Sequence, residues 1–60
     1  MTHTFHVVLA TAAGKAHEVD LDAPDAGAAA SRAAQDWSAA EPGLDLITHA
    51  MARMLGDDHL

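Results

Sequence analysis

The chain has 60 residues, half of them apolar, and a formal net charge of −6 at pH 7. Fifteen of the apolar residues are alanine, which leaves thirteen large apolar side chains once the two terminal residues are set aside. This limits the chain to one small domain, residues 1–60, in which we expect 1–3 and 56–60 to fray. One lysine and two arginines cannot neutralise a nucleic-acid backbone, and without cysteine there is no disulfide or thiolate metal site.

The apolar runs are short. The longest, Val7 to Ala10, cannot cross a membrane, and the N-terminus lacks the basic region and long apolar run of a signal peptide. The sequence therefore predicts a cytoplasmic protein that does not contact a membrane. Heavy use of alanine and aspartate with little lysine is typical of GC-rich bacterial or phage genomes.

Two strands begin the chain. Residues 4–10 and 16–22 both alternate apolar with polar side chains, which is the period of a strand. Both apolar sets share one face only if Val7 lies opposite Val19, which also sets Phe5 opposite Leu21 and Leu9 opposite His17. This register leaves a three-residue loop, 12–14, whose last position favours the left-handed conformation that Gly14 can adopt.

A helix follows the hairpin. It is predicted from Pro24 to about Ala39, with Asp22 or Ala23 as the N-cap and Asp25 favourable to the helix dipole. The residues predicted to face the strands form one stripe at spacings of four, three and four: Ala26, Ala30, Ala33 and Trp37. The turn Glu41-Pro42-Gly43 ends the helix.

The last segment, 44–55, supports two interpretations. Its apolar residues keep a helical period, which would give a ββαα fold with a C-terminal helix. A lone two-stranded hairpin is poorly stable, however, and a third strand starting within 44–48 would complete a sheet beneath the helix. We therefore predict an α+β fold of ββαβ type, with a three-stranded antiparallel sheet of order 2-1-3 covered on one face by one helix.

Five histidines are an unusual number for this length. The register places His6 opposite Asp20 on the uncovered face, and a third strand can bring His49 to the same face. These three residues are candidate ligands for Zn²⁺ or Ni²⁺. No His-x-x-x-His or His-Glu-x-x-His spacing occurs, so we predict no metal and no other cofactor. So few large side chains cannot readily enclose a catalytic pocket, and we predict that the chain is not an enzyme.

The uncovered sheet face is predicted to have an apolar centre rimmed by charged residues, as interaction surfaces do. The candidate partner-binding residues are Val8, Glu18, Asp20, Ile47, His49, Met51 and Arg53. The alternative interpretation is that these apolar residues are merely scattered over a solvated surface.

These features favour a small acidic, non-catalytic interaction module. We expect a homodimer that regulates or inhibits a basic, nucleic-acid-handling protein, because inhibitors encoded by phages and mobile elements are often small and acidic. It would not bind nucleic acid directly. The alternatives are a metal- or pH-responsive regulator built on the histidines, and a structural accessory subunit.

Overall fold

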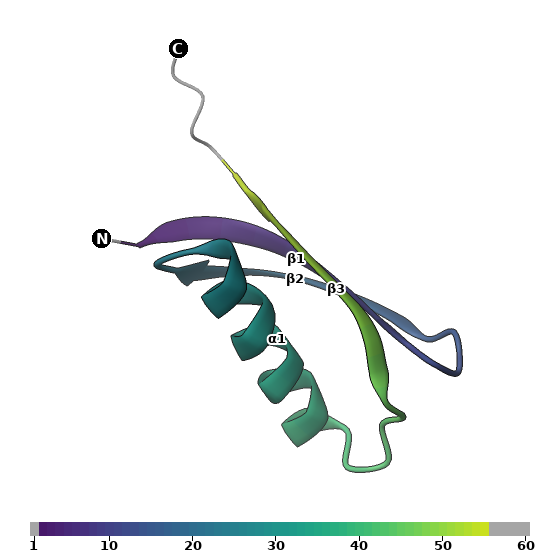
Figure 1. Ribbon diagram of the computed structural model, residues 1–60. Coiled ribbons are helices and arrows are strands. Elements are labelled where there is room, and N and C mark those ends of the chain that lie inside the picture. Colours follow the sequence, from purple (N-terminus) through teal and green to yellow (C-terminus); the bar gives the residue numbers. More distant parts are fainter. Residues whose placement is uncertain (1, 56–60) are drawn as a thin grey trace.

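Three strands and one helix follow one another as ββαβ in the computed structural model, which describes residues 2–55 (Figure 1). The sheet has the order β2-β1-β3 with both pairs antiparallel, so the predicted topology is confirmed and the ββαα alternative is wrong. No helix in the described part of the chain is long and apolar enough to span a membrane. Met1 and residues 56–60, both within the segments expected to fray, lie outside the described part, whereas His3 belongs to a strand. The elements are β1 (His3–Thr11), β2 (Ala16–Ala23), α1 (Ala26–Ala40) and β3 (Ile47–Met54).

The hairpin of β1 and β2 has the predicted register. Val7 pairs with Val19 and Phe5 with Leu21, which places the apolar side chains of both strands on one face. The loop between the strands requires a left-handed residue, and Gly14 supplies it with a φ of +90°. This apolar face of the hairpin therefore packs into the core, and we call it the inner face.

The helix begins two residues later than predicted. Asp25 is the N-cap, and its side chain accepts a hydrogen bond of 2.8 Å from the amide of Ala28. The predicted caps are wrong because both residues are used elsewhere. Ala23 still pairs with His3 in the sheet, and Asp22 accepts a hydrogen bond from Thr4.

Small side chains bring α1 close to the inner face. Its buried residues are Ala29, Ala33 and Trp37, which follow one another at spacings of four. Two members of the predicted stripe lie differently: Ala26 is exposed and Ala30 is only half-buried. Side chains of a helix lean toward its N-terminus. The side chain of Ala26, in the first turn, is therefore directed beyond the N-terminal end of the helix and not onto the strands.

Trp37 is the only large apolar residue of α1, and it is held from several sides. Its ring is 4% exposed and stacks on His17 of β2, with ring centroids 4.9 Å apart. Its indole N–H donates to Glu41, which also forms an ion pair with Lys15 beside the hairpin loop. The hydrogen bonds from Lys15 and then Trp37 hold the pKa of the Glu41 carboxyl below its ordinary value.

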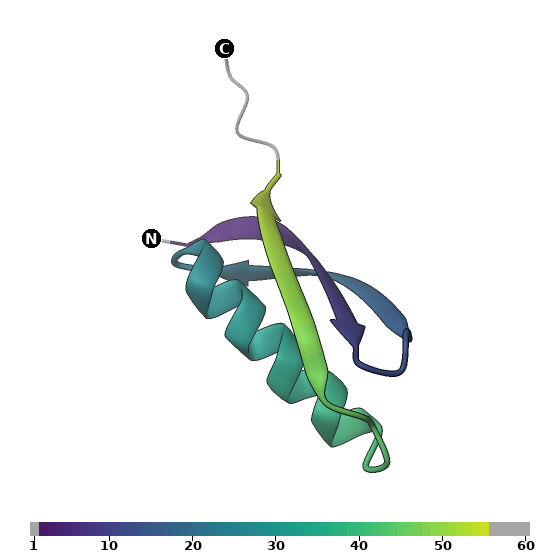
Figure 2. The ribbon, with the colours of Figure 1, turned by 45° about the vertical axis from the view of Figure 1, so that its right-hand side comes forward.

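β3 forms one edge of the sheet, next to the helix (Figure 2). This segment forms a strand although its apolar residues have a helical spacing, because β1 has a second row of backbone donors and acceptors with which the segment can pair. Its pairing with β1 shifts register between Ala10 and Thr11, so that Ala10 pairs with His49 and Thr11 with Ile47. Thr48 is the extra residue of a β-bulge. The side chain of Ile47, which precedes the bulge in β3, therefore lies on the opposite face from the one that strict alternation along the strand would assign.

Replacing the observed N-cap should destabilise the domain. We expect Asp25→Ala to lower the free energy of unfolding by about 1 kcal/mol, because the Ala28 amide loses its partner. Urea denaturation followed by circular dichroism measures this. Asp36→Ala, on the exposed side of α1, is the control and should change stability by less than about 0.5 kcal/mol. An equal loss in the two variants would contradict the assignment of the cap.

Truncating the helix anchor should have a larger effect. We expect Trp37→Ala to cost about 3–5 kcal/mol, because it removes the only large side chain that α1 buries. A domain of this size has little stability in reserve, so the variant should show loss of helical circular dichroism without denaturant. A folded variant with a nearly unchanged urea midpoint would show that the alanines alone hold the helix.

Candidate functional site

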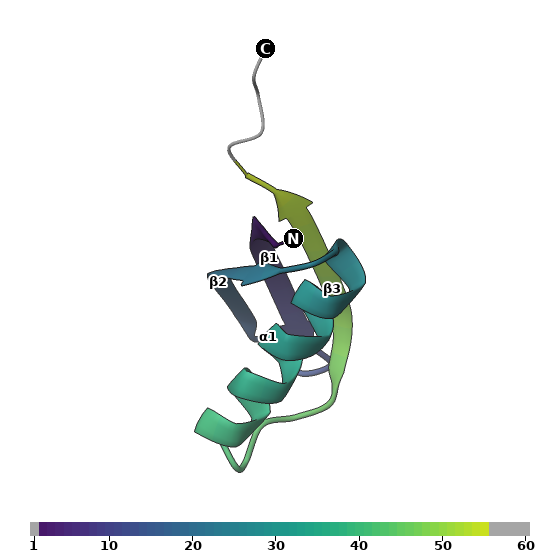
Figure 3. The same ribbon diagram turned by 90° about the vertical axis from the view of Figure 1, so that its left-hand side faces the viewer.

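Only α1 packs on the sheet within the described residues, and it lies against one face (Figure 3), so the opposite face is uncovered. We call it the outer face. The two registers determine its membership, because directly paired residues of antiparallel strands point to the same side. Its residues are Thr4, His6, Val8 and Ala10 of β1, Ala16, Glu18, Asp20 and Asp22 of β2, and His49, Met51 and Arg53 of β3.

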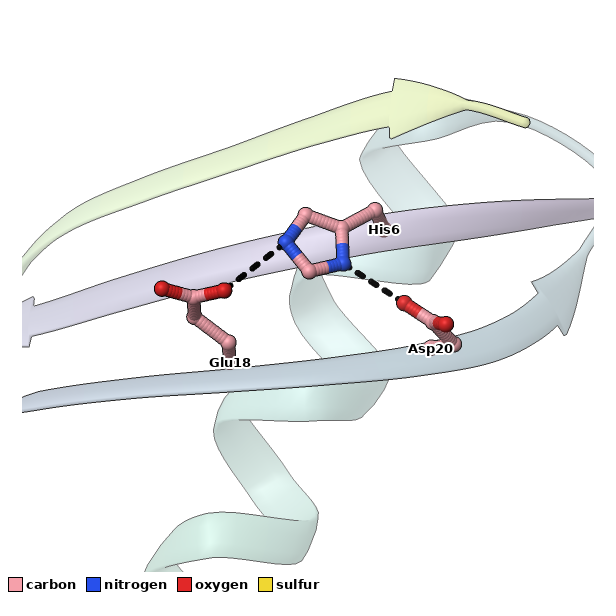
Figure 4. Close-up of polar contacts among 3 residues, drawn as sticks. All are labelled: His6, Glu18 and Asp20. Carbon is pink, nitrogen blue, oxygen red and sulfur yellow. Dashed lines mark hydrogen bonds and ion pairs between the residues drawn. The ribbon is translucent and has the colours of Figure 1, made fainter.

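His6 lies between two carboxylates of the neighbouring strand (Figure 4). Its Nδ1 is 2.6 Å from Oδ1 of Asp20, the residue directly opposite, and its Nε2 is 3.1 Å from Oε1 of Glu18. A neutral imidazole has one N–H, whereas an imidazolium can donate to both carboxylates at once. The geometry therefore favours the protonated ring. The hydrogen bond with Asp20 raises the pKa of His6 against partial desolvation, assisted by the charge of Asp20 and by Glu18.

The third carboxylate of β2 is also held from β1. The hydroxyl of Thr4 donates a hydrogen bond of 2.6 Å to Oδ1 of Asp22. Each acidic side chain of β2 thus has a polar partner on the central strand, yet all three residues remain exposed. The result is a row of positioned carboxylates along β2, which we call the acidic row: Glu18, Asp20 and Asp22.

Beside the acidic row lies a shallow hollow of about 290 Å³. Val8 and Met51, which pair across β1 and β3, are its apolar residues, and Met51 leaves 70% of its surface exposed. The other residues that line it are His6, Glu18 and Arg53. The outer face therefore combines a small apolar centre with carboxylates on the β2 side and a guanidinium on the β3 side.

Four of the predicted partner-binding residues meet at this hollow: Val8, Glu18, Met51 and Arg53. Asp20 adjoins it through His6. Ile47 does not belong to the outer face, because the bulge at Thr48 turns it toward the core, against which it packs half-buried. His49 lies on the outer face but outside the hollow, opposite Ala10.

The candidate metal ligands are only partly brought together. His6 and Asp20 are in contact, but His49 pairs with Ala10, four residues from His6 along β1, or about 13 Å at the rise of a strand. Within residues 2–55, no group of three His, Cys, Asp or Glu side chains is arranged to hold a metal ion. Both ring nitrogens of His6 instead face carboxylates.

Sequence reasoning missed the contact between His6 and Glu18. The predicted register, with Val7 opposite Val19, implies the correct pairing of Glu18 with Val8, but the prediction matched His6 only with Asp20, the residue directly opposite. A diagonal neighbour on the adjacent strand is within reach of a long side chain, and that rule would have identified the bridging role of His6.

Comparisons with protein-family models, with curated proteins and with solved structures found no match to this chain.

The contacts of His6 predict a pH dependence of stability. Folding raises the pKa of His6 above its ordinary value of 6.5, so the added stability is complete below that value and is lost as the pH rises through the folded pKa. We expect Asp20→Asn to destabilise the domain more at about pH 6 than at about pH 8. Urea denaturation at both pH values measures the difference. Asp36→Asn, with its carboxylate on the exposed side of α1, should show no such dependence.

Proposed function

We propose that this chain is a non-catalytic interaction module that binds the cationic surface of a protein partner through its outer face. The observation that carries the proposal is the acidic row beside an apolar centre. Three of the nine acidic residues of the chain stand together on β2, held in place by Thr4 and His6. Side chains that are already ordered lose less conformational entropy on binding.

The composition of the outer face favours a protein partner. The apolar pair of Val8 and Met51 gives a partner surface to bury, and the surrounding carboxylates give it charges to match. The polar groups around the hollow are open to water, which suits recognition of an extended surface better than chemistry on a small enclosed substrate. This supports a binding role rather than an enzymatic one.

The charge of the chain favours a basic partner over a nucleic acid. A net charge of −6 repels phosphates, and it attracts the cationic surfaces with which nucleic-acid-handling proteins bind their own ligands. Covering such a surface would compete with nucleic acid, so the proposed role is that of a regulator or inhibitor. The working form that we propose is a homodimer in the cytoplasm.

A peptide of alternating lysine and leucine, labelled with a fluorophore, is a suitable probe for this surface. We expect its binding, measured by fluorescence anisotropy, to weaken steeply between about 0.05 M and about 0.5 M salt, because exposed charges are screened. The double variant Glu18→Gln with Asp20→Asn should bind about two- to tenfold more weakly at low salt.

The matched control is Asp36→Asn with Asp45→Asn. It changes the net charge equally, from −6 to −4, but at exposed positions on α1 and in the loop before β3. It should bind the probe nearly as the unmodified chain does. Binding that is insensitive to salt would contradict the proposal, and so would an equal loss in the two double variants, since only overall charge would then matter.

A further inference from the structure

The free edge of β3 carries backbone groups that no strand pairs with in the described part of the chain. The amide of Leu55 donates to the carbonyl of Thr4. Because antiparallel ladders alternate, every second residue before Leu55 also directs its backbone groups to β1, and the residues between direct theirs outward. These outward groups belong to Ala50, Ala52 and Met54. They form an unused row of donors and acceptors along a regular stretch that follows the bulge.

The other edge of the sheet is protected. Thr11 donates to the carbonyl of Lys15, and the same alternation then directs the backbone groups of the acidic row away from β1. The outward groups of β2 are thus accompanied by three carboxylates. Charged side chains along a strand edge oppose pairing with another chain, and natural sheets use them for this purpose.

The edge at β3 lacks that protection and is apolar. β3 contains no acidic residue and a single cation, Arg53. The large apolar side chains exposed among residues 2–55 all lie on β3 or directly before it: Leu46 at 71%, Met51 at 70% and Met54 at 38%. Ala50 is exposed although its pairing with Leu9 places it on the inner face, so the space beside the helix is open at this edge.

We infer that the free edge of β3 pairs antiparallel with β3 of a second copy of this chain, forming a six-stranded sheet with both helices on one side. Antiparallel pairing about a two-fold axis uses the same groups on both copies. The axis passes beside Met51, so that Ala50 of each copy exchanges hydrogen bonds with Ala52 of the other copy. This register sets the two Met51 side chains side by side on the combined outer face, where both remain accessible to a partner, and keeps the two Arg53 side chains apart.

The distribution of charge favours a second copy of this chain as the partner at the free edge of β3. Each copy carries a net charge of −6, so two copies repel wherever carboxylates would meet. β3 is the strand without carboxylates, and approach along it keeps the two acidic rows on the far edges of the combined sheet. A basic partner, in contrast, finds its complementary charges at β2. The inference deepens the proposed function by giving the second copy a place that leaves the acidic rows free.

Substitution of Ala50 by proline tests whether the free edge of β3 pairs with a second copy. The amide of Ala50 points outward, so Ala50→Pro removes a donor from the proposed contact and none from the pairing with β1. Ala16→Pro is the matched control, because it makes the same substitution at an outward amide of the other edge. Sedimentation velocity should give twice the 6.2 kDa chain mass for the unmodified protein and for Ala16→Pro, and the single mass for Ala50→Pro. Circular dichroism checks that each variant is folded.

Cysteine cross-linking tests the register and does not depend on a folded proline variant. The chain has no cysteine, so Met51→Cys provides one thiol per copy. Facing residues of a non-hydrogen-bonded pair have Cα atoms about 4.5 Å apart, within disulfide range. Mild oxidation should link the Met51→Cys copies and leave Arg53→Cys copies unlinked. A monomeric unmodified protein, a dimeric and folded Ala50→Pro variant, or Arg53→Cys copies that link as fully as Met51→Cys copies would each overturn the inference.

The two proposals can fail separately. The monomeric Ala50→Pro variant should still bind the lysine-leucine peptide with the affinity per chain of the unmodified protein, because its acidic row is intact. An unmodified protein that is dimeric but does not bind the peptide would defeat the proposed binding role of the outer face and leave the inferred dimer standing. A monomeric unmodified protein that binds the peptide would defeat the dimer in both proposals and leave the binding role of the outer face standing.

Discussion

Burial of Trp37 is the interaction on which the rest of the structure depends. Every other apolar residue of α1 is alanine, so without the indole ring the helix would have little apolar surface to bury. The ring joins three parts of the chain, since it stacks on His17 of β2 and donates to Glu41, which binds Lys15 beside the hairpin loop. Attaching the helix in this way covers one face of the sheet and leaves the other open.

The division between the two sheet faces follows from how few large side chains the chain has. Phe5, Val7 and Leu9 of the central strand all lie beneath the helix, and little apolar surface remains for a second layer. The outer face is therefore built from polar contacts, with His6 between two carboxylates and Val8 beside Met51 at the centre. A thin core and an exposed, ordered polar surface are two consequences of the same composition.

The parts of the structure that follow from residue period could be predicted, and those that depend on a single inserted residue or on competition for a group could not. Opposing Val7 to Val19 was enough to determine the hairpin and most of the outer face. The bulge at Thr48 leaves no mark in the apolar pattern, and it moved Ile47 to the core side. The helix start was missed because the competition of Thr4 for Asp22 arises only once the strands have paired, which leaves Asp25 to cap the helix.

Charge is distributed over the sheet edges in a way that would allow the two proposed contacts to form on one small chain. β2 carries three acidic residues and β3 none, while β1 separates them. Exposed charges more than about 10 Å apart are largely screened at moderate salt, and two strand spacings place the outer strands about that far apart. The acidic row can therefore attract a cationic surface without strongly opposing self-association at β3. A chain of uniform acidity would have to overcome its own repulsion at every edge, whereas this one concentrates the repulsion on β2, where charge also protects the unpaired backbone.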